Sequence, residues 1–191
     1  MIKRSSAVLV AIPLLACAAL AKTVSQEVSV AADQKIRIDA DRGEVAIAVS
    51  KKQSLSYEVE FVTDRKSFWP LGGRGLSEEQ SKDSWASFDA GTGTLRVHAA
   101  KGVNALIKVG VPATAALDLK LGAGKVRIEA RSGRVDAELL AGTMSYDGAG
   151  LPRGACVDAL VKTGVTRNTR DSDCASVGAK LRNGTGTITI D

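Results

Sequence analysis

The chain has 191 residues, a net charge of +5 and 45% hydrophobic residues, a balance typical of folded proteins that excludes wholesale disorder. Aromatic residues make up only 4% of it while glycine occurs 19 times, so we expect an aliphatic core and many turns. One histidine, His98, excludes a histidine-rich metal site and leaves little for a serine–histidine or cysteine–histidine catalytic pair.

Residues 1–21 have the layout of a secretory signal peptide. Lys3 and Arg4 precede a short apolar stretch, and Ala19 and Ala21 form a small-residue cleavage site. The apolar stretch is shorter than the ~20 residues that a membrane-spanning helix needs. We therefore expect cleavage after Ala21 and export, with the periplasm as the destination.

A second interpretation of the same segment is a lipoprotein signal. Leu14 and Leu15 lead into Cys17, which would then be lipidated and hold the mature protein at a membrane. Display at the cell surface is a further alternative. Removal of the signal peptide takes away two basic residues and lowers the net charge to +3, which argues against a nucleic-acid-binding protein.

The remaining chain, residues 22–191, is interpreted as one domain built on a glycine-led repeat. A glycine followed by apolar residues at alternate positions recurs at Gly43, Gly93, Gly124, Gly133 and Gly186, with weaker copies at Gly142 and Gly164. Gly124, Gly133 and Gly142 follow one another at intervals of nine residues. Gly142, Gly164 and Gly186 follow one another at intervals of twenty-two. Such alternation predicts strands with one buried face, and a glycine before each strand suits a turn with positive φ.

The predicted strands are residues 24–30, 35–40, 44–49, 54–62, 94–99, 104–110, 115–121, 125–130, 134–139, 143–147, 155–162, 176–182 and 186–190. Short, evenly spaced strands with aliphatic inner positions predict an all-β fold, and in particular a β-solenoid whose coils stack on one another. Charged residues at the alternate positions are expected to form a solvated face that discourages edge pairing.

A long loop over residues 63–92 interrupts the repeat. Its Ser77 and Gln80 have the spacing of a capping box before a short helix near 78–85. The loop contains the aromatic residues Phe68, Trp69, Trp85 and Phe88. They could cover the open end of the stack, or they could contact an envelope protein or a glycan, since tryptophan is favoured at interfaces.

Two cysteines remain after the signal peptide, Cys156 and Cys174. An even count in an exported chain predicts a disulfide, which would close a loop of about 18 residues and stabilise the fold by about 3 kcal/mol. Two free thiols are the alternative. The spacing is not that of a Cys-x-x-Cys redox motif.

The sequence pattern of the repeat resembles that of a known family. Residues 107–113 and 117–128 place an apolar-x-apolar segment ending in Val-Pro before a strand and a small-Gly-x-apolar step. This pattern, continued by Gly133, Gly142 and residues 184–190, is similar to bacterial "putative adhesin" domains of the DUF4097 type and their auto-transporter-adhesin-head-like relatives. The resemblance covers most of residues 24–191 and implies a β-helix-like stack of coils. It brings no catalytic residues, and Lys125, Arg134 and Thr187 stand where an acidic residue often follows the glycine.

An enzyme acting on polysaccharides is the alternative function, because some lyases and hydrolases use β-helices. It would need carboxylates paired on one face beside a basic residue. The candidates are Asp39, Asp41 and Glu44, and separately Asp171 and Asp173. His98 is expected to point outward from its strand.

The sequence thus predicts a non-catalytic exported envelope protein, an adhesin-like structural or binding module. No cofactor, metal or catalytic residue is expected, and its partner would be an unidentified envelope protein or glycan. A membrane would be a partner only if Cys17 were lipidated.

Overall fold

The computed structural model describes residues 21–31, 34–63, 75–129, 132–151, 155–168 and 176–191. Within them it forms β1 (Lys22–Ser29), β2 (Ile36–Ser50), β3 (Ser54–Thr63), α1 (Glu78–Asp83), β4 (Trp85–Asp89), β5 (Thr94–His98), β6 (Val103–Pro112), β7 (Leu117–Ile128), β8 (Val135–Tyr146), the 3₁₀ turn η1 (Gly148–Gly150), β9 (Ala155–Asn168) and β10 (Ser176–Ile190). The predicted all-β class is confirmed.

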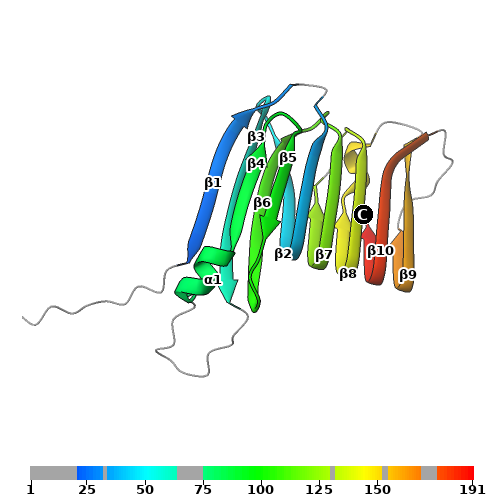
Figure 1. The fold of residues 1–191 in the computed structure, drawn as a ribbon. Coiled ribbons are helices and arrows are strands. Elements are labelled where there is room, and N and C mark those ends of the chain that lie inside the picture. Colours follow the sequence, from blue (N-terminus) through cyan, green and yellow to red (C-terminus); the bar gives the residue numbers. More distant parts are fainter. Residues whose placement is uncertain (1–20, 32–33, 64–74, 130–131, 152–154, 169–175) are drawn as a thin grey trace, which may run out of the picture.

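The strands form one open sheet, in which they stand side by side from β1 at one end to β9 at the other (Figure 1). Their order is β1-β3-β6-β2-β7-β8-β10-β9. From β6 to β9 neighbouring strands are parallel, whereas β3 and β1 continue the sheet antiparallel. The short pair β5 and β4 lies against the first half of β2. Parallel neighbours need connections that carry the chain back to the same end of the sheet.

A glycine in the middle of each long strand reverses the side-chain alternation. In β7, Leu119 and Leu121 are buried before Gly124, and Val126 and Ile128 are buried after it. The odd-numbered positions thus point inward in the first half and the even-numbered ones in the second. Because a regular strand keeps its alternation, this change lets both halves present apolar side chains to the same interior.

These glycines form a ladder across the sheet, the glycine ladder. Gly43, Gly124, Gly142, Gly186 and Gly164 are register partners on β2, β7, β8, β10 and β9, with φ between +136° and +143°. A Cβ added to Gly124 would lie 1.8 Å from the carbonyl oxygen of Gly43. The predicted positive φ is confirmed for these glycines and for Gly93 but is wrong for Gly133, whose added Cβ would instead lie 2.3 Å from the carbonyl oxygen of Ala115. The ladder glycines lie inside continuous strands and not between separate ones. Predicted pairs such as 35–40 and 44–49 are therefore the two halves of one strand.

The core is almost wholly aliphatic, as the composition predicts. The side chains of its inner rows are fully buried and belong to one apolar cluster. Examples with 0% exposure are Ile38, Leu119, Ala137 and Leu181. Each strand contributes small branched or unbranched side chains that pack against those of its neighbours. This packing buries apolar surface continuously along the sheet and supplies the main favourable free energy of folding.

The order of the strands corrects one expectation. In the predicted solenoid each coil would stack on the preceding one, so β9 would lie next to β8 and β10 next to β9. Instead β10 lies between β8 and β9, so the strand that follows β8 in sequence, β9, lies at the end of the sheet. The three strands carry equivalent glycines, and the repeat itself does not distinguish the two arrangements.

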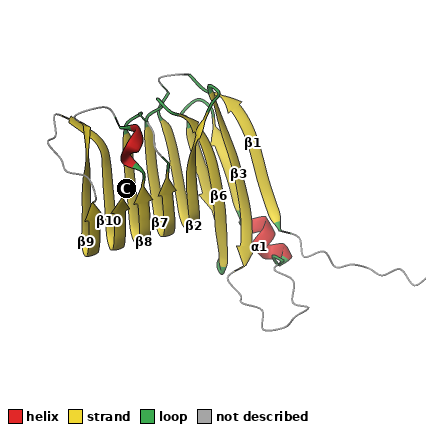
Figure 2. Ribbon diagram, turned by 180° about the vertical axis from the view of Figure 1, so that it is seen from behind, coloured by secondary structure: helices red, strands yellow, loops and turns green. Residues whose placement is uncertain are grey.

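The 63–92 region contains more regular structure than expected. The predicted helix is present as α1, and its capping box is confirmed: the Ser77 hydroxyl accepts from the Gln80 backbone N–H, and the Gln80 side chain accepts from the Ser77 N–H. The strand β4 that follows was not predicted. Figure 2 shows α1 beside the lower ends of β1 and β3. There Lys22 donates from Nζ to the carbonyl oxygens of Ser81 and Ser84 at 2.7 and 2.6 Å.

Candidate functional site

The two aromatic residues of the 63–92 region that the structure describes lie on opposite faces of β4. Phe88 points inward, packs against the core and lies 6.3 Å from Tyr57 between ring centroids. Trp85, three residues earlier, points outward and is 44% exposed. Strand alternation explains the division, because positions 85 and 88 differ in parity. Phe88 therefore covers the core, and Trp85 is available for contact.

Trp85 belongs to a row of three side chains from three strands, the Trp85 row. Its ring stacks on His98 of β5, with centroids 5.9 Å apart and planes 30° apart. Nδ1 of His98 lies 2.5 Å from Oδ2 of Asp41 on β2. The register places them together: Trp85 pairs with His98, and Asp41 follows Ala40, the partner of Val97. His98 points outward, as predicted, and is half exposed.

A hollow of about 330 Å³ continues the Trp85 row across β7 and β8. Gly122 forms part of its floor and has no side chain; a Cβ there would lie 2.3 Å from the carbonyl oxygen of Asp41. Side chains around the floor are Asp39, Asp41, Lys120, Glu138 and Leu140. Leu140 is 61% exposed and supplies apolar surface at the far side of the hollow. The hollow thus combines hydrogen-bonding groups with an apolar side chain.

Opposite charges alternate across the strands beside this hollow. Arg96, Asp39, Lys120, Glu138 and Arg182 are successive register partners on β5, β2, β7, β8 and β10. Directly opposed charges of unlike sign stabilise neighbouring strands modestly. The row keeps a surface of many charges close to neutral overall, and it orients Asp39 and Glu138 on either side of Lys120.

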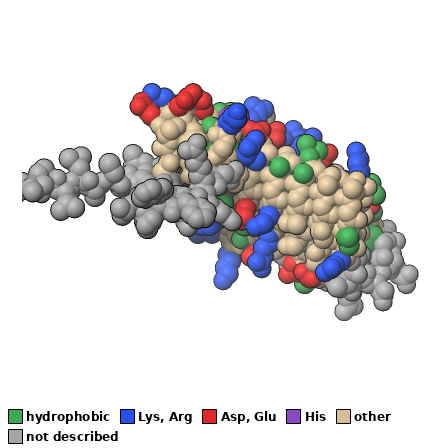
Figure 3. Space-filling model, turned by 90° about the horizontal axis from the view of Figure 1, so that it is seen from below, with side chains coloured by type: hydrophobic (Ala, Val, Ile, Leu, Met, Phe, Trp, Pro, Cys, Tyr) green, Lys and Arg blue, Asp and Glu red, His purple; other side chains and the backbone are tan. Residues whose placement is uncertain are grey.

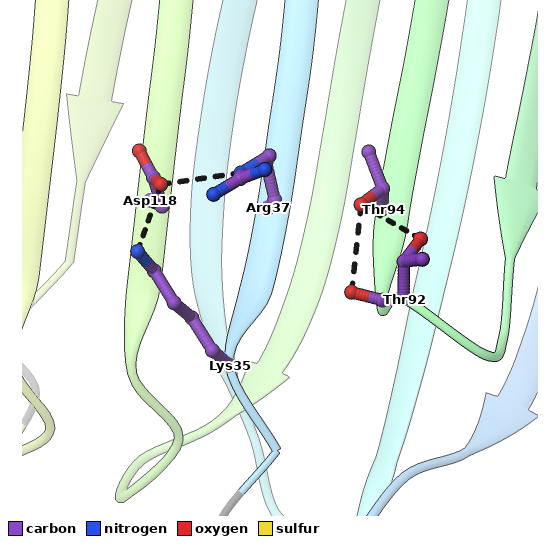
Figure 4. Close-up of polar contacts among 5 residues, drawn as sticks. All are labelled: Lys35, Arg37, Thr92, Thr94 and Asp118. Carbon is purple, nitrogen blue, oxygen red and sulfur yellow. Dashed lines mark hydrogen bonds and ion pairs between the residues drawn. The ribbon is translucent and has the colours of Figure 1, made fainter.

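One carboxylate of this outward side is held firmly. Asp118 of β7 lies 2.9 Å from Nζ of Lys35 and 3.2 Å from Nε of Arg37, and only 14% of its side chain is exposed (Figure 4). Burial by itself raises the pKa of Asp118, but the two cations outweigh burial and hold the pKa of this carboxyl below its usual value. Asp118 therefore acts as a structural anchor between β2 and β7.

Seen from below, charged side chains of both signs border a smooth central area of backbone and small side chains (Figure 3). A second, open hollow of about 750 Å³ lies at the glycine ladder and is lined by Gly43, Gly124 and Gly142 together with Asp41 and Lys125. Lys125 and Glu44 form an ion pair of 2.9 Å there. Asp41 borders both hollows and so links the Trp85 row to the hollow at the glycine ladder.

The carboxylates considered for catalysis separate into two groups. Asp39 and Asp41 border the same hollow together with Lys120, whereas Glu44 lies past the bend and pairs with Lys125. Within the described part of the chain, no three or more histidine, cysteine or acidic side chains gather as a metal site. In that same part, no helix is long and apolar enough to cross a bilayer.

Several predicted residues lie outside the described residues. They are Cys17, Ala19, Phe68, Trp69, Asp171, Asp173 and Cys174. Their predicted roles stay predictions. Cys156 lies near the start of β9, and its register partner is Val177, three residues after Cys174.

Sequence reasoning missed the Trp85 row because it missed β4. The signal was present in the alternation from Trp85 to Asp89, in which Ala86 and Phe88 are the inward positions. The contact between His98 and Asp41 joins residues 57 positions apart. No local pattern reveals such a contact.

No model of a known protein family matches the sequence, and no curated protein matches it. Among solved structures, a "putative cell adhesion protein" from Clostridium sporogenes is similar over 90% of this chain and 99% of its own, with a TM-score of 0.52 and 11% identity. A "putative adhesin" from Parabacteroides merdae covers 88% of this chain and 81% of its own at a TM-score of 0.36 and 11% identity. One from Bacteroides fragilis covers 89% and 97% at 0.33 and 11%. The Clostridium protein thus shares the fold of this chain.

Proposed function

We propose that this chain is an exported, non-catalytic binding module of the cell envelope, adhesin-like in architecture and related to the DUF4097 type. Its bent parallel strands would then be the coils of a short β-solenoid closed by antiparallel strands at one end. The fold shared with a "putative cell adhesion protein" supports the adhesin-like part of this proposal. Export to the periplasm rests on the layout of residues 1–21.

The observation that carries the proposal is the exposed ring of Trp85. Large aromatic side chains are usually buried, and one that is 44% exposed and supported by a stacked histidine is suited to contact. His98 and Asp41 hold each other, so the ring lies on a pre-organised support. The adjoining hollow extends the contact surface across two further strands.

A neutral glycan fits this surface better than a protein or an acidic polymer. A sugar ring presents an apolar face that can stack on Trp85, while its hydroxyls can bond to Asp39, Asp41 and Glu138. Three carboxylates against one lysine around the hollow disfavour an anionic ligand. A chain of sugars lying across the strands would run from Trp85 toward Leu140.

Binding is tested with a panel of neutral and acidic bacterial polysaccharides, measured by calorimetry on the purified chain. We expect a neutral polysaccharide to bind, and Trp85→Ala to weaken its binding by about tenfold or more. Val49→Ala serves as the matched control, because Val49 is exposed at the other end of β2 and should leave binding unchanged. Equal loss in both variants would contradict the assignment to Trp85.

A photo-crosslinker at position 85 separates ligand class from contact site. If position 85 labels an envelope protein and no glycan binds, Trp85 is still the contact site, but the ligand is a protein and not a glycan. No labelling beyond the chain itself, together with no glycan binding, would overturn the binding function.

A polysaccharide-cleaving enzyme stays the alternative, favoured by one observation: Asp39 and Asp41 border one hollow with Lys120. Incubation of any bound polysaccharide with the protein, followed by analysis of chain length, tests it. A binding module leaves the polymer intact. Shortening that disappears in Asp41→Asn would establish the enzyme instead.

Export and the disulfide are tested together by the intact mass of the protein isolated from its native envelope without reductant. Cleavage after Ala21 predicts a chain that starts at Lys22 and is lighter by two hydrogens. The register supports the bond, because Ser176, two residues after Cys174, is the partner of Ala155, next to Cys156. An acylated Cys17 at the first position would make the protein a lipoprotein.

A further inference from the structure

The last strand of the sheet has one open side. Among the described strands, β9 has β10 as its one neighbour, and no described strand pairs with its outer edge (Figure 1). An edge strand presents a row of N–H and C=O groups that can pair with another chain. The edge of β9 is long, since the strand has 14 residues.

The described residues also leave the interior incompletely covered at this end. Val157, Ala159 and Val161 occupy the inner positions of β9 and are half-buried. The inner positions of neighbouring β10, such as Ala179 and Leu181, are fully buried at 0% exposure. Of the six large hydrophobic side chains exposed in the described residues, three lie on β9 and β10: Leu160, Val165 and Val177. Apolar surface therefore gathers where the sheet ends.

We propose that two copies of this chain pair through their β9 strands, antiparallel and centred on Leu160, to form a dimer with one continuous sheet. A two-fold axis through Leu160 makes the contact isologous, the commonest arrangement of soluble homodimers. This interaction is separate from the ligand surface at Trp85 and does not depend on it.

The charges of β9 select this register. With Leu160 opposite its own copy, Asp158 lies opposite Lys162 of the second copy, and Lys162 opposite the second Asp158. Centring the pair on Asp158 or on Lys162 would instead oppose two like charges, which destabilises a cross-strand pair. Asp158 already contacts Arg182 at 2.5 Å, which orients its carboxylate on the outward side.

The apolar positions agree with the same register. Ala159 comes opposite Val161, so the inner rows of the two copies continue into one another. The pairing spans residues 157–163, which all precede Gly164, where the glycine ladder bends the strand. The unbent half of β9 is therefore long enough for the contact, and the bend does not interfere.

The proposal is tested on the purified chain by light scattering and sedimentation over a series of concentrations. We expect a dimer, and we expect Leu160→Lys to raise its dissociation constant by about tenfold or more, because two lysines would then face each other at the axis. Leu140→Lys is the matched control: Leu140 is as exposed, on the same outward side, but lies on β8 inside the sheet. It should leave the dimer intact.

A crosslink keeps the test independent of any effect on folding. Under mild oxidation, Leu160→Cys should form a covalent dimer through position 160, because directly opposed residues have Cβ atoms about 4.5–5.5 Å apart. Leu140→Cys should not. A wild-type chain that stays monomeric at every concentration would overturn the proposal, and so would a dimer that neither Leu160→Lys weakens nor Leu160→Cys traps.

Discussion

The two ends of the sheet are finished differently. At the β1 end, the antiparallel strands β3 and β1 continue the sheet, β4 pairs with β5, and the aromatic side chains Phe61, Tyr57 and Phe88 pack into the apolar interior. At the β9 end, the described chain stops at a parallel strand whose inner residues are half-buried. A sheet that buries one face needs cover at each end, because an end strand has a neighbour on one side only. The described residues cover the interior at the β1 end, and we infer that a second copy covers it at the β9 end.

Between the ends, every strand has a neighbour on both sides. The glycine ladder requires each bend to approach its neighbour closely, and a strand in the middle cannot shift without displacing two others. The edge strand β9 has one described neighbour and more freedom. The same substitution should therefore cost more in the middle than at the edge, and the following comparisons use that difference.

The largest effect is expected from Gly124→Ala. Its Cβ would lie 1.8 Å from the Gly43 carbonyl oxygen at a φ of +141°, between two fixed strands. We expect the free energy of unfolding in urea to fall by about 4 kcal/mol or more. Gly164→Ala meets the same obstacle on the edge strand and should cost clearly less, since β9 can move outward. Equal losses would show that the edge is as constrained as the middle.

The next effect comes from the covered end. Phe61 is fully buried, and Phe61→Ala should lower the free energy of unfolding by about 3–4 kcal/mol because it leaves a cavity. Leu160→Ala at the open end removes a 53%-exposed side chain and should change it by about 0.5 kcal/mol or less in dilute solution. The Leu160 effect should grow with protein concentration, because association stabilises the folded chain. A large loss for Leu160→Ala at high dilution would show that the chain itself covers this residue.

The open end should also depend on its cysteines. If Cys156 and Cys174 are joined, Cys156→Ser should lower the free energy of unfolding by about 3 kcal/mol when no reductant is present. In reductant, the wild type and the variant should unfold at the same Tm. A loss of equal size in both conditions would contradict the disulfide and leave Cys156 as a packing residue of β9.

The smallest effect concerns the ion pairs. The pKa of Asp118 is lowered in the folded state, so its carboxylate stabilises the fold above the unfolded pKa and loses that contribution as pH falls through the folded pKa. Asp118→Asn should cost about 1 kcal/mol at neutral pH. The difference in free energy of unfolding between the variant and wild type should shrink as acid protonates Asp118. Urea unfolding at a series of decreasing pH values measures this difference.

Asp158 provides the matched measurement at the open end. A hydrogen bond from Arg182 lowers the pKa of Asp158 too, but 45% of its side chain is exposed. Solvent screens such a pair, so Asp158→Asn should cost less than Asp118→Asn in the monomer. A larger cost that appears only at high concentration would instead report the Asp158–Lys162 contact between copies.

Much of the secondary structure follows from local patterns. Alternation of apolar residues places nearly every strand, the glycines mark positive φ, and Ser77 with Gln80 marks the start of α1. Each of these signals depends on residues within four positions of one another. Two features differ from the prediction: the ladder glycines are bends inside continuous strands, and residues 85–89 of the predicted loop form the strand β4.

The candidate site was predictable only in its parts. Trp85 was a predicted contact, and Asp39 and Asp41 were considered for chemistry, each from its residue type. Their meeting beside His98 and Lys120 depends on strand register between segments far apart in the chain. Residue type shows what a side chain can do, and register shows which side chains act together.

The sequence by itself therefore determined an all-β chain with an aliphatic interior and with positive φ at most of its repeated glycines, because these properties depend on near neighbours along the chain. The tertiary structure alone decided that β10 lies between β8 and β9, and that Phe88 faces the core while Trp85 meets His98 and Asp41. The physical reason is that strands with the same glycine and the same apolar spacing are interchangeable in pattern. Only the packing of each strand against its actual neighbours selects one order and leaves β9 as an edge strand.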